Sequence, residues 1–428
     1  MRCSPRLPTL ATRDPPAMPF FPAWARRRLV GSTPPGRAGD RKTTATPAAA
    51  PLSSSISAPV PPPPPPFPTP PPALWAAIVE TYAQATASGA VCRTDTAASI
   101  LPDGGWGFVL RSAAATLAAK DKAGRRQGSA PSSPARPKAA AAPPPPTTDT
   151  WFNPFSPPDP RLVVLRAPAF PPTHILALNK FNLAPHHTLV ITSCFERQEA
   201  PLTPGDLGAT WAVLDAYPGA GGLAYFNRGP GSGASQPHKH LQVVPLPLDG
   251  IEKGGGAQTG FDGAPSTTAR APFEGSVLEA TVQAALYEPV PLRSLPFRAW
   301  GARLPGGRDA GGSQPSPAAL AACVSALATA AGAPPSLQDW TPGDSLAAIQ
   351  AGRGPGGGTA SWNLALTRRC VLVVARPPPG SAAAAAALNL NAIAYAGSLY
   401  ARGPADMEAM ARAGGPMGLL AAGGVGWG

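Results

Sequence analysis

A run of proline divides this 428-residue chain into a first segment that cannot build a core and a longer one that can. Between Pro59 and Pro72, eleven of fourteen residues are proline, which predicts a stiff polyproline II spacer. Such a spacer could also bind an SH3-like partner. The segment before it lacks the apolar content of a core. We therefore expect residues 1–72 to be a disordered tail, and order to begin near Leu74.

The positive charge of the chain is concentrated where we expect disorder. The whole chain carries 35 basic and 23 acidic residues, a balance that in a folded domain would indicate nucleic-acid binding. Residues 1–72 hold nine basic and two acidic side chains, and the Ala/Pro-rich stretch 121–149 holds five and two. The rest is close to neutral, so no nucleic-acid partner is expected. No apolar run has the length of a membrane span, so no membrane partner is expected either.

The N-terminal tail has the composition of a targeting segment. It is rich in Arg, Ser and Thr, poor in acids, and has no compact apolar stretch, which is typical of an organelle transit peptide. A plain basic tail is the alternative. We expect import into an organelle, with a chloroplast favoured over a mitochondrion, and a cytoplasmic protein if the tail is not a transit peptide. The five cysteines form no C-x-x-C pair, which favours a reducing compartment and disfavours a structural zinc site.

Hydrophobic patterning predicts short strands interleaved with helices. Thr203 and Pro204 provide an N-cap and a first helical residue. The expected helices are 74–82, 203–217 and 388–402, and the expected strands are 107–111, 163–165, 174–179, 188–193, 223–226, 238–244 and 366–375. Because the elements do not alternate strictly, an α+β fold is favoured over a doubly wound sheet.

Low-complexity stretches set the expected domain limits. We expect insertions at 121–149, which should be disordered, and at 253–272, 303–317 and 351–359, where loops tolerate extra length. The folded part is then 73–402, with an N-terminal part at 73–250 and a C-terminal part at 273–402. A Gly/Ala-rich tail, 403–428, follows.

The chemistry-bearing residues gather in one stretch of the chain. All five histidines lie within residues 174–240, and the densest feature joins a glycine-rich loop to the sequence His-Lys-His-Leu-Gln. Alternate side chains of a strand share a face. The pattern therefore predicts that His238, His240 and Gln242 point one way and Lys239 the other.

The glycine-rich loop before these histidines suits a phosphate group. Glycines at 229, 231 and 233 let backbone N–H groups turn toward an anion, and Ser235 and Gln236 add side-chain donors. Neither a P-loop nor a dinucleotide-binding fingerprint is present. Paired histidines could hold a metal ion, but no third ligand accompanies them. A neutral imidazole that attacks phosphorus is the favoured interpretation.

The same stretch resembles the signature of a known enzyme family. Asn-x-Gly at 227–229 followed by Gly-Ala-Ser-Gln-x-His-Lys-His-x-Gln at 233–242 is similar to the diadenosine tetraphosphate phosphorylases, or ATP adenylyltransferases, in the transferase branch of the histidine-triad superfamily. Further motifs of this family occur in order at 153–155, 178–182, 186–189, 362–369 and 391–397. The resemblance covers about 74–120, 151–250 and 360–402. It implies a histidine-triad-like antiparallel sheet with flanking helices.

The resemblance also implies roles for individual residues. His240 corresponds to the family's nucleophile, which would carry the adenylyl group, and His238 would support its orientation. The positions that match substrate contacts are Lys120 (with Lys122 as a rival), Asn179, Lys180, Asn227, Gly233, Ala234, Ser235, Gln236, Gln242, Leu366, Thr367 and Arg376. Cys370 and Ala375 depart from the family, where an aromatic residue and proline are usual.

Some of these residues have plainer explanations. His174, His186 and His187 are expected to pack or to bond backbone at strand ends. Lys180 could be an ordinary solvated lysine, and the two arginines at 368 and 369 could simply flank a buried strand.

The resemblance implies phosphorolysis of diadenosine tetraphosphate by inorganic phosphate, giving ATP and ADP reversibly through an adenylyl-histidine. The partners would be a dinucleoside polyphosphate, ATP, ADP and phosphate. A divalent cation, most simply Mg²⁺, would be carried on the substrate phosphates, with no metal site in the protein. The alternatives are a hydrolase or a sugar-1-phosphate nucleotidylyltransferase of the same superfamily, and a non-catalytic nucleotide-binding protein. Lys239 disfavours the sugar-1-phosphate branch, in which proline is usual at that position.

Overall fold

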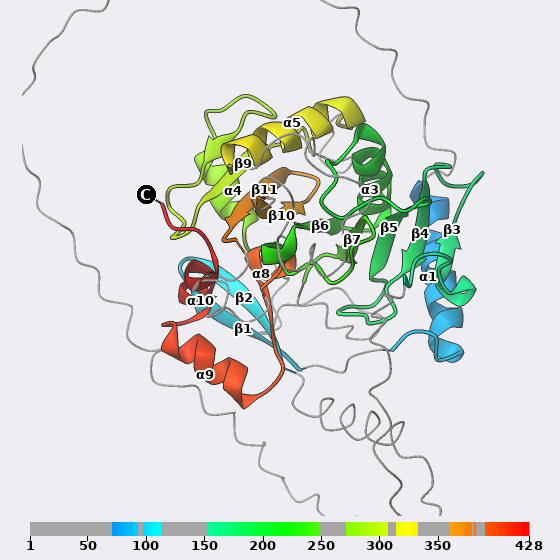
Figure 1. The fold of residues 1–428 in the computed structure, drawn as a ribbon, viewed down its shortest axis with the longest axis horizontal. Coiled ribbons are helices and arrows are strands. Elements are labelled where there is room, and N and C mark those ends of the chain that lie inside the picture. The colour runs from blue at the N-terminus through cyan, green and yellow to red at the C-terminus, as the bar shows by residue number, and fades with distance from the viewer. Residues whose placement is uncertain are drawn as a thin grey trace, which may run out of the picture. The chain divides into compact units, whose positions relative to one another are not determined.

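A nine-stranded antiparallel sheet forms the centre of the fold in this computed structural model (Figure 1). The structure describes residues 71–92, 97–112, 153–248, 271–306, 314–332, 360–378, 381 and 390–427. The expected tail 1–72 lies outside these residues except for Pro71 and Pro72, which begin a helix and not the expected polyproline spacer. The expected insertion at 121–149 and most of the other expected insertions also lie outside the described residues. All described residues fall within one compact unit, Ser57–Gly428.

The large sheet joins the N-terminal and C-terminal parts of the chain through one strand pair, β6 with β10. Every neighbouring pair in it is antiparallel. In spatial order its strands are β3 (Val163–Leu165), β4 (His174–Leu178), β5 (Thr188–Thr192), β7 (His240–Pro245), β6 (Gly222–Arg228), β10 (Ser361–Leu366), β11 (Cys370–Arg376), β9 (Ala299–Arg303) and β8 (Val290–Pro291). The expected α+β fold with an antiparallel sheet and flanking helices is confirmed.

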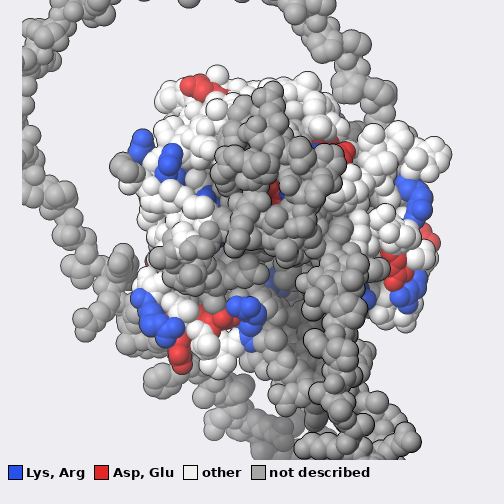
Figure 2. All heavy atoms as spheres, viewed as in Figure 1, with Lys and Arg blue, Asp and Glu red and all other residues white. Residues whose placement is uncertain are grey.

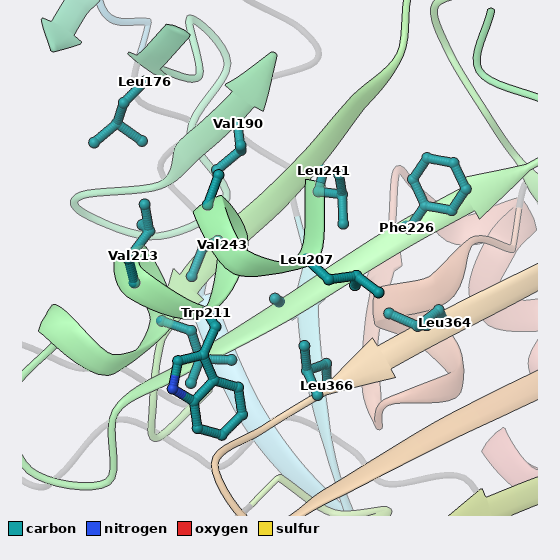
Figure 3. Packing of buried hydrophobic residues seen from close by; sticks show 14 of the residues in the cluster. Leu176, Val190, Leu207, Trp211, Val213, Phe226, Leu241, Val243, Leu364 and Leu366 are labelled. Atoms are coloured by element: carbon teal, nitrogen blue, oxygen red, sulfur yellow. The ribbon is translucent and has the colours of Figure 1, made fainter. Parts of the chain in front are cut away.

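Three helices cover one face of this sheet. They are α1 (Pro71–Ala87), α3 (Pro204–Ala216) and α5 (Pro317–Ala330), with α3 between the other two. Figure 3 shows apolar side chains of β4, β5, β7, β6 and β10, all aliphatic except Phe226 of β6, around Leu207, Trp211 and Val213 of α3. The start of α3 is as expected: Thr203 caps it in a reciprocal box with Asp206, and Pro204 is its first residue. A cap of this kind is worth about 1 kcal/mol.

The opposite face is covered in its C-terminal half by a small sheet and four helices. The small sheet has the order β1 (Ala97–Asp103), β2 (Trp106–Ser112) and β12 (Ser398–Ala401). The helices are α4 (Glu274–Ala280), α8 (Ala392–Tyr395), α9 (Pro404–Arg412) and α10 (Pro416–Gly423). Their buried side chains form a second core cluster against β6, β10 and β11. Two 3₁₀ turns, η2 (Pro160–Leu162) and η3 (Pro230–Ser232), complete the described elements. The N-terminal half of this face carries His240 and Gln242 of β7, whereas His174 and His186 contact α3 and α1 on the first face.

Three expectations about the C-terminal part are wrong. The expected strand 366–375 is two strands, β10 and β11, joined by a turn at 367–369. The expected helix 388–402 is α8 followed by β12, because Gly397 has φ +102° and a Cβ there would meet the ring of Pro272. Residues 403–428 are not simply a Gly/Ala-rich tail, since α9 and α10 bury Met410, Leu419 and Leu420.

The visible surface of the described residues mixes both signs of charge. Figure 2 shows Lys and Arg interspersed with Asp and Glu over the face presented, with broad uncharged areas between them. None of the described helices is long and apolar enough to cross a lipid bilayer.

Candidate active site

His240 has one ring nitrogen fixed and the other available. It is the first residue of β7 and is buried. Its Nδ1 lies 2.8 Å from the carbonyl oxygen of His238. Because a carbonyl oxygen can only accept, Nδ1 carries the proton and Nε2 keeps its lone pair. Burial lowers the pKa of His240 to about 4, so the imidazole is neutral and nucleophilic at pH 7.

His238 is not placed as a second nucleophile. It precedes β7, although the sequence predicts a strand from 238, and its ring Nε2 lies 3.0 Å from the Thr192 carbonyl and 3.2 Å from that of Cys194. Its Nδ1 lies 3.1 Å from Nδ2 of Asn153. Both ring nitrogens are therefore engaged. Burial lowers its pKa as well. The side chain anchors the chain segment whose carbonyl orients His240.

Gln242 lies on the same face of β7 as His240, and a polar cluster fixes its amide. Its Oε1 accepts from Tyr225 Oη at 2.9 Å and from His187 Nε2 at 3.0 Å, and it lies 3.3 Å from Asn179 Nδ2. Burial lowers the pKa of His187 to about 3, so this ring is neutral too. His187 thus has a structural role, as expected, and this role is to hold the amide of Gln242. With Oε1 occupied, the amide NH₂ of Gln242 is the group left for a ligand.

The glycine-rich loop is bound to the C-terminal strands more tightly than the sequence predicts. Gly231 N–H donates to Ser361 Oγ at 3.0 Å, so it is not available to an anion. A Cβ at 231 would lie 2.2 Å from the Pro377 carbonyl oxygen, and one at Gly233, where φ is +79°, would lie 2.8 Å from that of Leu390. These glycines permit close packing of the loop against the C-terminal part.

The end of the loop remains suited to an anion. Among the described residues, the backbone N–H groups of Gly233, Ala234 and Ser235 have no hydrogen-bond partner. These residues directly precede the segment that carries both histidines. Three consecutive free donors beside a left-handed glycine can form an anion-binding concavity. The predicted phosphate cradle is thus narrowed to positions 233–235.

Asn227 ties the loop to the C-terminal part. Its Oδ1 accepts from Asn363 Nδ2 at 2.8 Å and from the Ala392 N–H at 2.8 Å. Asn363 also donates to the Ser232 carbonyl at 2.8 Å. Because Oδ1 is saturated, Asn227 can offer only its NH₂ group to a ligand. Residues from β10 and α8 therefore fix a residue that the sequence assigns to the N-terminal part.

Lys239 points away from this face, as the alternation of β7 predicts. Its Nζ lies 2.7 Å from Asp206 Oδ2 and 2.9 Å from Glu196 Oε2. Asp206 also lies 2.9 Å from Nε2 of His174, which accounts for that expected structural histidine. The bonds from His174 and Lys239 hold the pKa of Asp206 down to about 2, although burial alone would raise it.

The remaining predicted residues are placed unevenly. Arg376 reaches the loop, with Nε 3.1 Å from the Gly231 carbonyl and its guanidinium 4.7 Å over the ring of Tyr395. Lys180 is exposed, 5.9 Å over its neighbour Phe181. The structure does not bring Leu366 or Thr367 to the cluster. Leu366 packs into the core beside α3 (Figure 3). Thr367 belongs to the turn after β10, where its hydroxyl accepts from the Arg369 N–H. Lys120 and Lys122 lie outside the described residues.

Four supporting residues receive no role from the sequence, although Asn153, Phe155 and Asn363 stand in the motifs at 153–155 and 362–369. Asn153 and Phe155 belong to a recognised motif, but nothing in it indicates that Phe155 lies 5.1 Å from the His240 ring. Tyr225 and Asn363 act through Gln242 and Asn227, and cross-strand register is the signal that would have found them. Within the described ranges, no group of three or more His, Cys, Asp or Glu side chains is arranged to hold a metal ion.

Two protein-family models match consecutive parts of the chain. A model of the Ap4A phosphorylase N-terminal domain matches residues 66–254, and a model of the ATP adenylyltransferase C-terminal domain matches residues 293–426. The first contains the histidines and the loop, and the second contains Asn363 and Arg376. The candidate site is therefore assembled from both.

Curated relatives match a shorter stretch. Over 126 residues, the chain is 37% identical to diadenosine 5',5'''-P1,P4-tetraphosphate phosphorylase 2 of Saccharomyces cerevisiae. The aligned stretch covers 28% of this chain and 38% of that protein. Over 76 residues it is 40% identical to protein APA1 of the same yeast. That aligned stretch covers 17% of this chain and 24% of APA1. The matched stretches thus span well under half the length of these relatives.

Solved structures match over a greater length. The crystal structure of yeast Ap4A phosphorylase Apa2 in complex with AMP has a TM-score of 0.54 and 23% identity, and the match covers 82% of this chain and 97% of that chain. The crystal structure of the same enzyme in complex with Ap4A gives the same values. These likenesses show that the chain has this fold.

Proposed function

Since this chain belongs to the family of Ap4A phosphorylases and ATP adenylyltransferases, we propose that it is a nucleotidyltransferase that phosphorolyses diadenosine tetraphosphate. Inorganic phosphate is the co-substrate, and ATP and ADP are the products. The reaction is reversible because each step exchanges one bond to phosphorus for another.

The geometry of His240 is the observation that carries this proposal. The 2.8 Å bond from Nδ1 to the His238 carbonyl leaves Nε2 with a lone pair, and a pKa of about 4 keeps the ring neutral. Nε2 attacks the α-phosphorus of one adenosine end, and the bond from that phosphorus to the bridging oxygen breaks. ATP leaves, and the adenylyl group stays on His240. A phosphate oxygen then attacks the same phosphorus, which releases ADP and free imidazole.

The unpaired donors of the loop and of Gln242 support charge stabilisation during both steps. The N–H groups of Gly233, Ala234 and Ser235 have no partner among the described residues, and the Gln242 amide is held with its NH₂ group unused by Tyr225 and His187. Fixed donors of this kind stabilise the charge that develops on phosphoryl oxygens. The aromatic ring of Phe155 beside His240 offers a surface for a nucleobase.

A divalent cation, most simply Mg²⁺, enters this reaction on the phosphates of the substrate. It would neutralise part of the polyphosphate charge. The donor set of the candidate site is amides and backbone N–H groups, which suit an anion rather than a cation. Omitting Mg²⁺ should therefore weaken turnover without changing the unfolding temperature of the protein.

The location of the protein is a separate part of the proposal. The basic, acid-poor composition of residues 1–72 supports import into an organelle, with a chloroplast favoured. A fluorescent fusion of these residues should enter the organelle. A fusion that stays in the cytosol would remove this part and leave the enzymatic part intact.

The decisive assay gives purified protein diadenosine tetraphosphate with and without phosphate. We expect equal amounts of ATP and ADP, formed only when phosphate is present. Phosphate-independent release of AMP would instead indicate a hydrolase, and binding without turnover would indicate a nucleotide-binding protein. Labelled substrate without phosphate should leave an acid-labile phosphorus–nitrogen adduct that maps to His240 and disappears when phosphate is added.

A further inference from the structure

The hydrogen-bonded ladder between β6 and β7 stops just before the candidate nucleophile. Paired residues run from Gly222 with Pro245 to Tyr225 with Gln242. Continuing this register would place Asn227 opposite His240. These two residues, both assigned to the site, do not bond to each other directly.

The side-chain amide of Gln198 lies between them instead. Its Nε2 is 3.0 Å from the Asn227 carbonyl oxygen and 3.2 Å from that of His240. Its Oε1 accepts from the His240 N–H at 2.9 Å. The amide therefore acts as an extra peptide unit in the ladder. Strands that pair directly lie about 4.8 Å apart, so an inserted amide holds β6 and β7 farther apart at this level.

Neighbouring bonds fix Gln198 from both strands. The side chain is buried, and its backbone N–H donates to the Pro237 carbonyl at 2.8 Å. On the β7 side, the Lys239 N–H donates to the Glu196 carbonyl at 2.7 Å. On the β6 side, Arg228 Nε donates to the Glu199 carbonyl at 2.8 Å. The segment 196–199 is thus held at the ends of both strands, with the Gln198 amide directed between them.

We propose that Gln198 is a positioning residue for adenylyl transfer, whose amide sets the separation between the nucleotide-binding Asn227 and the nucleophilic His240. This inference rests on the proposed function. Gln198 need not touch the substrate. It holds the backbone of His240 at the place from which Nε2 reaches the phosphorus of a nucleotide held by Asn227 and the loop. A displacement of about 1 Å at such a centre can cost about 100-fold in rate.

The chemistry of the amide makes the inference specific. Gln198→Met keeps the length of the side chain and removes all three bonds, so β6 and β7 can shift toward direct pairing. Gln198→Glu keeps an acceptor for the His240 N–H but loses the donor to the two carbonyl oxygens. Burial raises the pKa of the introduced carboxyl group. Once protonated, that group can again donate to one carbonyl and accept from His240.

The test compares these variants with the wild type and with Val324→Ala, a core truncation in α5 that controls for lost stability. Phosphorolysis gives kcat and KM, and calorimetric titration with AMP gives affinity. We expect Gln198→Met to lower kcat about 100-fold while AMP affinity changes little and Val324→Ala keeps the wild-type kcat. We expect the kcat of Gln198→Glu, relative to wild type at each pH, to rise as pH falls.

Two results would overturn the inference. One is a kcat for Gln198→Met within about threefold of the wild type. The other is a kcat of Gln198→Glu, relative to wild type, that equals one or does not change with pH. This second variant also decides the matter if Gln198→Met does not fold. Neither result affects the proposed function, because that function fails only if the wild-type protein itself has no phosphate-dependent turnover.

Discussion

The Nζ atom of Lys239 lies 2.7 Å from Oδ2 of Asp206, and both side chains are almost completely removed from solvent, at 1% and 2% exposure. The lysine stands between the two histidines of the candidate site, and the carboxylate belongs to α3 on the other side of the sheet. This ion pair fastens the segment beside β7 to α3 on one side of the sheet, whereas the side chain of His240 lies on the opposite side.

Removing one partner of this pair should be costly. Lys239→Met leaves the buried carboxylate of Asp206 without its lysine, and breaking a buried pair in this way costs about 3 to 5 kcal/mol. Arg161→Met is the matched control, because it breaks an Arg–Asp pair at the surface. Solvent screens such an exposed pair, so its loss should cost little stability. Urea unfolding of both variants measures the difference, and equal losses would contradict the assignment of a buried network.

His240→Ala and His238→Ala should separate chemistry from positioning. His240→Ala removes the proposed nucleophile, so turnover should vanish while AMP affinity survives through the loop and Gln242. His238→Ala keeps the backbone carbonyl that orients His240 and loses the ring bonds to Thr192 and Cys194. We expect a smaller loss, about 10- to 100-fold in kcat. Steady-state kinetics with AMP titration checks both, and substantial phosphorolysis by His240→Ala would refute the covalent route.

The acid side of the pH–rate profile should lie well below the ordinary histidine range. Protonation of Nε2 would inactivate the proposed nucleophile, and burial lowers the pKa of His240 to about 4. The value of kcat/KM should therefore stay constant from pH 7 to about pH 5 and fall near pH 4. A decline centred near 6.5 in a protein still folded by circular dichroism would show that the ring is solvated in solution.

The same burial predicts a stability profile with a defined sign. An unfolded histidine takes up a proton as pH falls through about 6.5, whereas folded His240 stays neutral to about 4. The unfolded state binds more protons in this window, so the free energy of unfolding falls as pH is lowered. Between pH 7.5 and pH 5 the loss from His240 is about 2 kcal/mol. In chemical denaturation, His240→Gln should show a correspondingly shallower dependence on pH.

Gly233→Ala should weaken nucleotide binding, and Gly89→Ala should not. Both glycines have positive φ, +79° and +67°, so both substitutions carry a similar backbone strain of about 1 kcal/mol. A Cβ at 233 would also press on the Leu390 carbonyl, whereas nothing lies within 4 Å of one at 89. The phosphate cradle should shift in the first variant. Titration with AMP measures the difference, and equal affinities would show that the loop does not contact the nucleotide.

Local patterns predicted the parts of this fold that local physics determines. The cap at Thr203 and the alternation that separates Lys239 from His240 follow from residues adjacent in sequence, whereas α1 begins at Pro71, inside the stretch expected to be a polyproline spacer. The break at Gly397 does not, because it depends on the approach of Pro272 from a distant part of the chain. The assignment of residues 403–428 to a tail has the same cause, because their apolar side chains are buried against the small sheet, whose strands β1 and β2 are distant in sequence: α10 packs on β1, and α9 packs on β12.

The site followed the same division. The His-Lys-His-x-Gln pattern identifies His240 and Gln242 from the sequence. The amide of Gln198 and the hold of Asn363 on Asn227 could not be found there, because they depend on which strands are neighbours. The motif around Leu366 indicates the family, but it does not show that Leu366 contacts a substrate, because this side chain packs in the core.

The pairing of β6 with β10 means that the boundary between the two family models falls inside one hydrogen-bonded sheet. An N-terminal fragment ending at residue 248 would present β6 as an open edge and leave Oδ1 of Asn227 without Asn363 and Ala392. Unpaired edges of this kind favour aggregation. Two fragments produced together, cut between residues 248 and 271, have complementary edges. The chain is therefore suited to split-protein complementation, in which recovered activity reports that two fused partners have met.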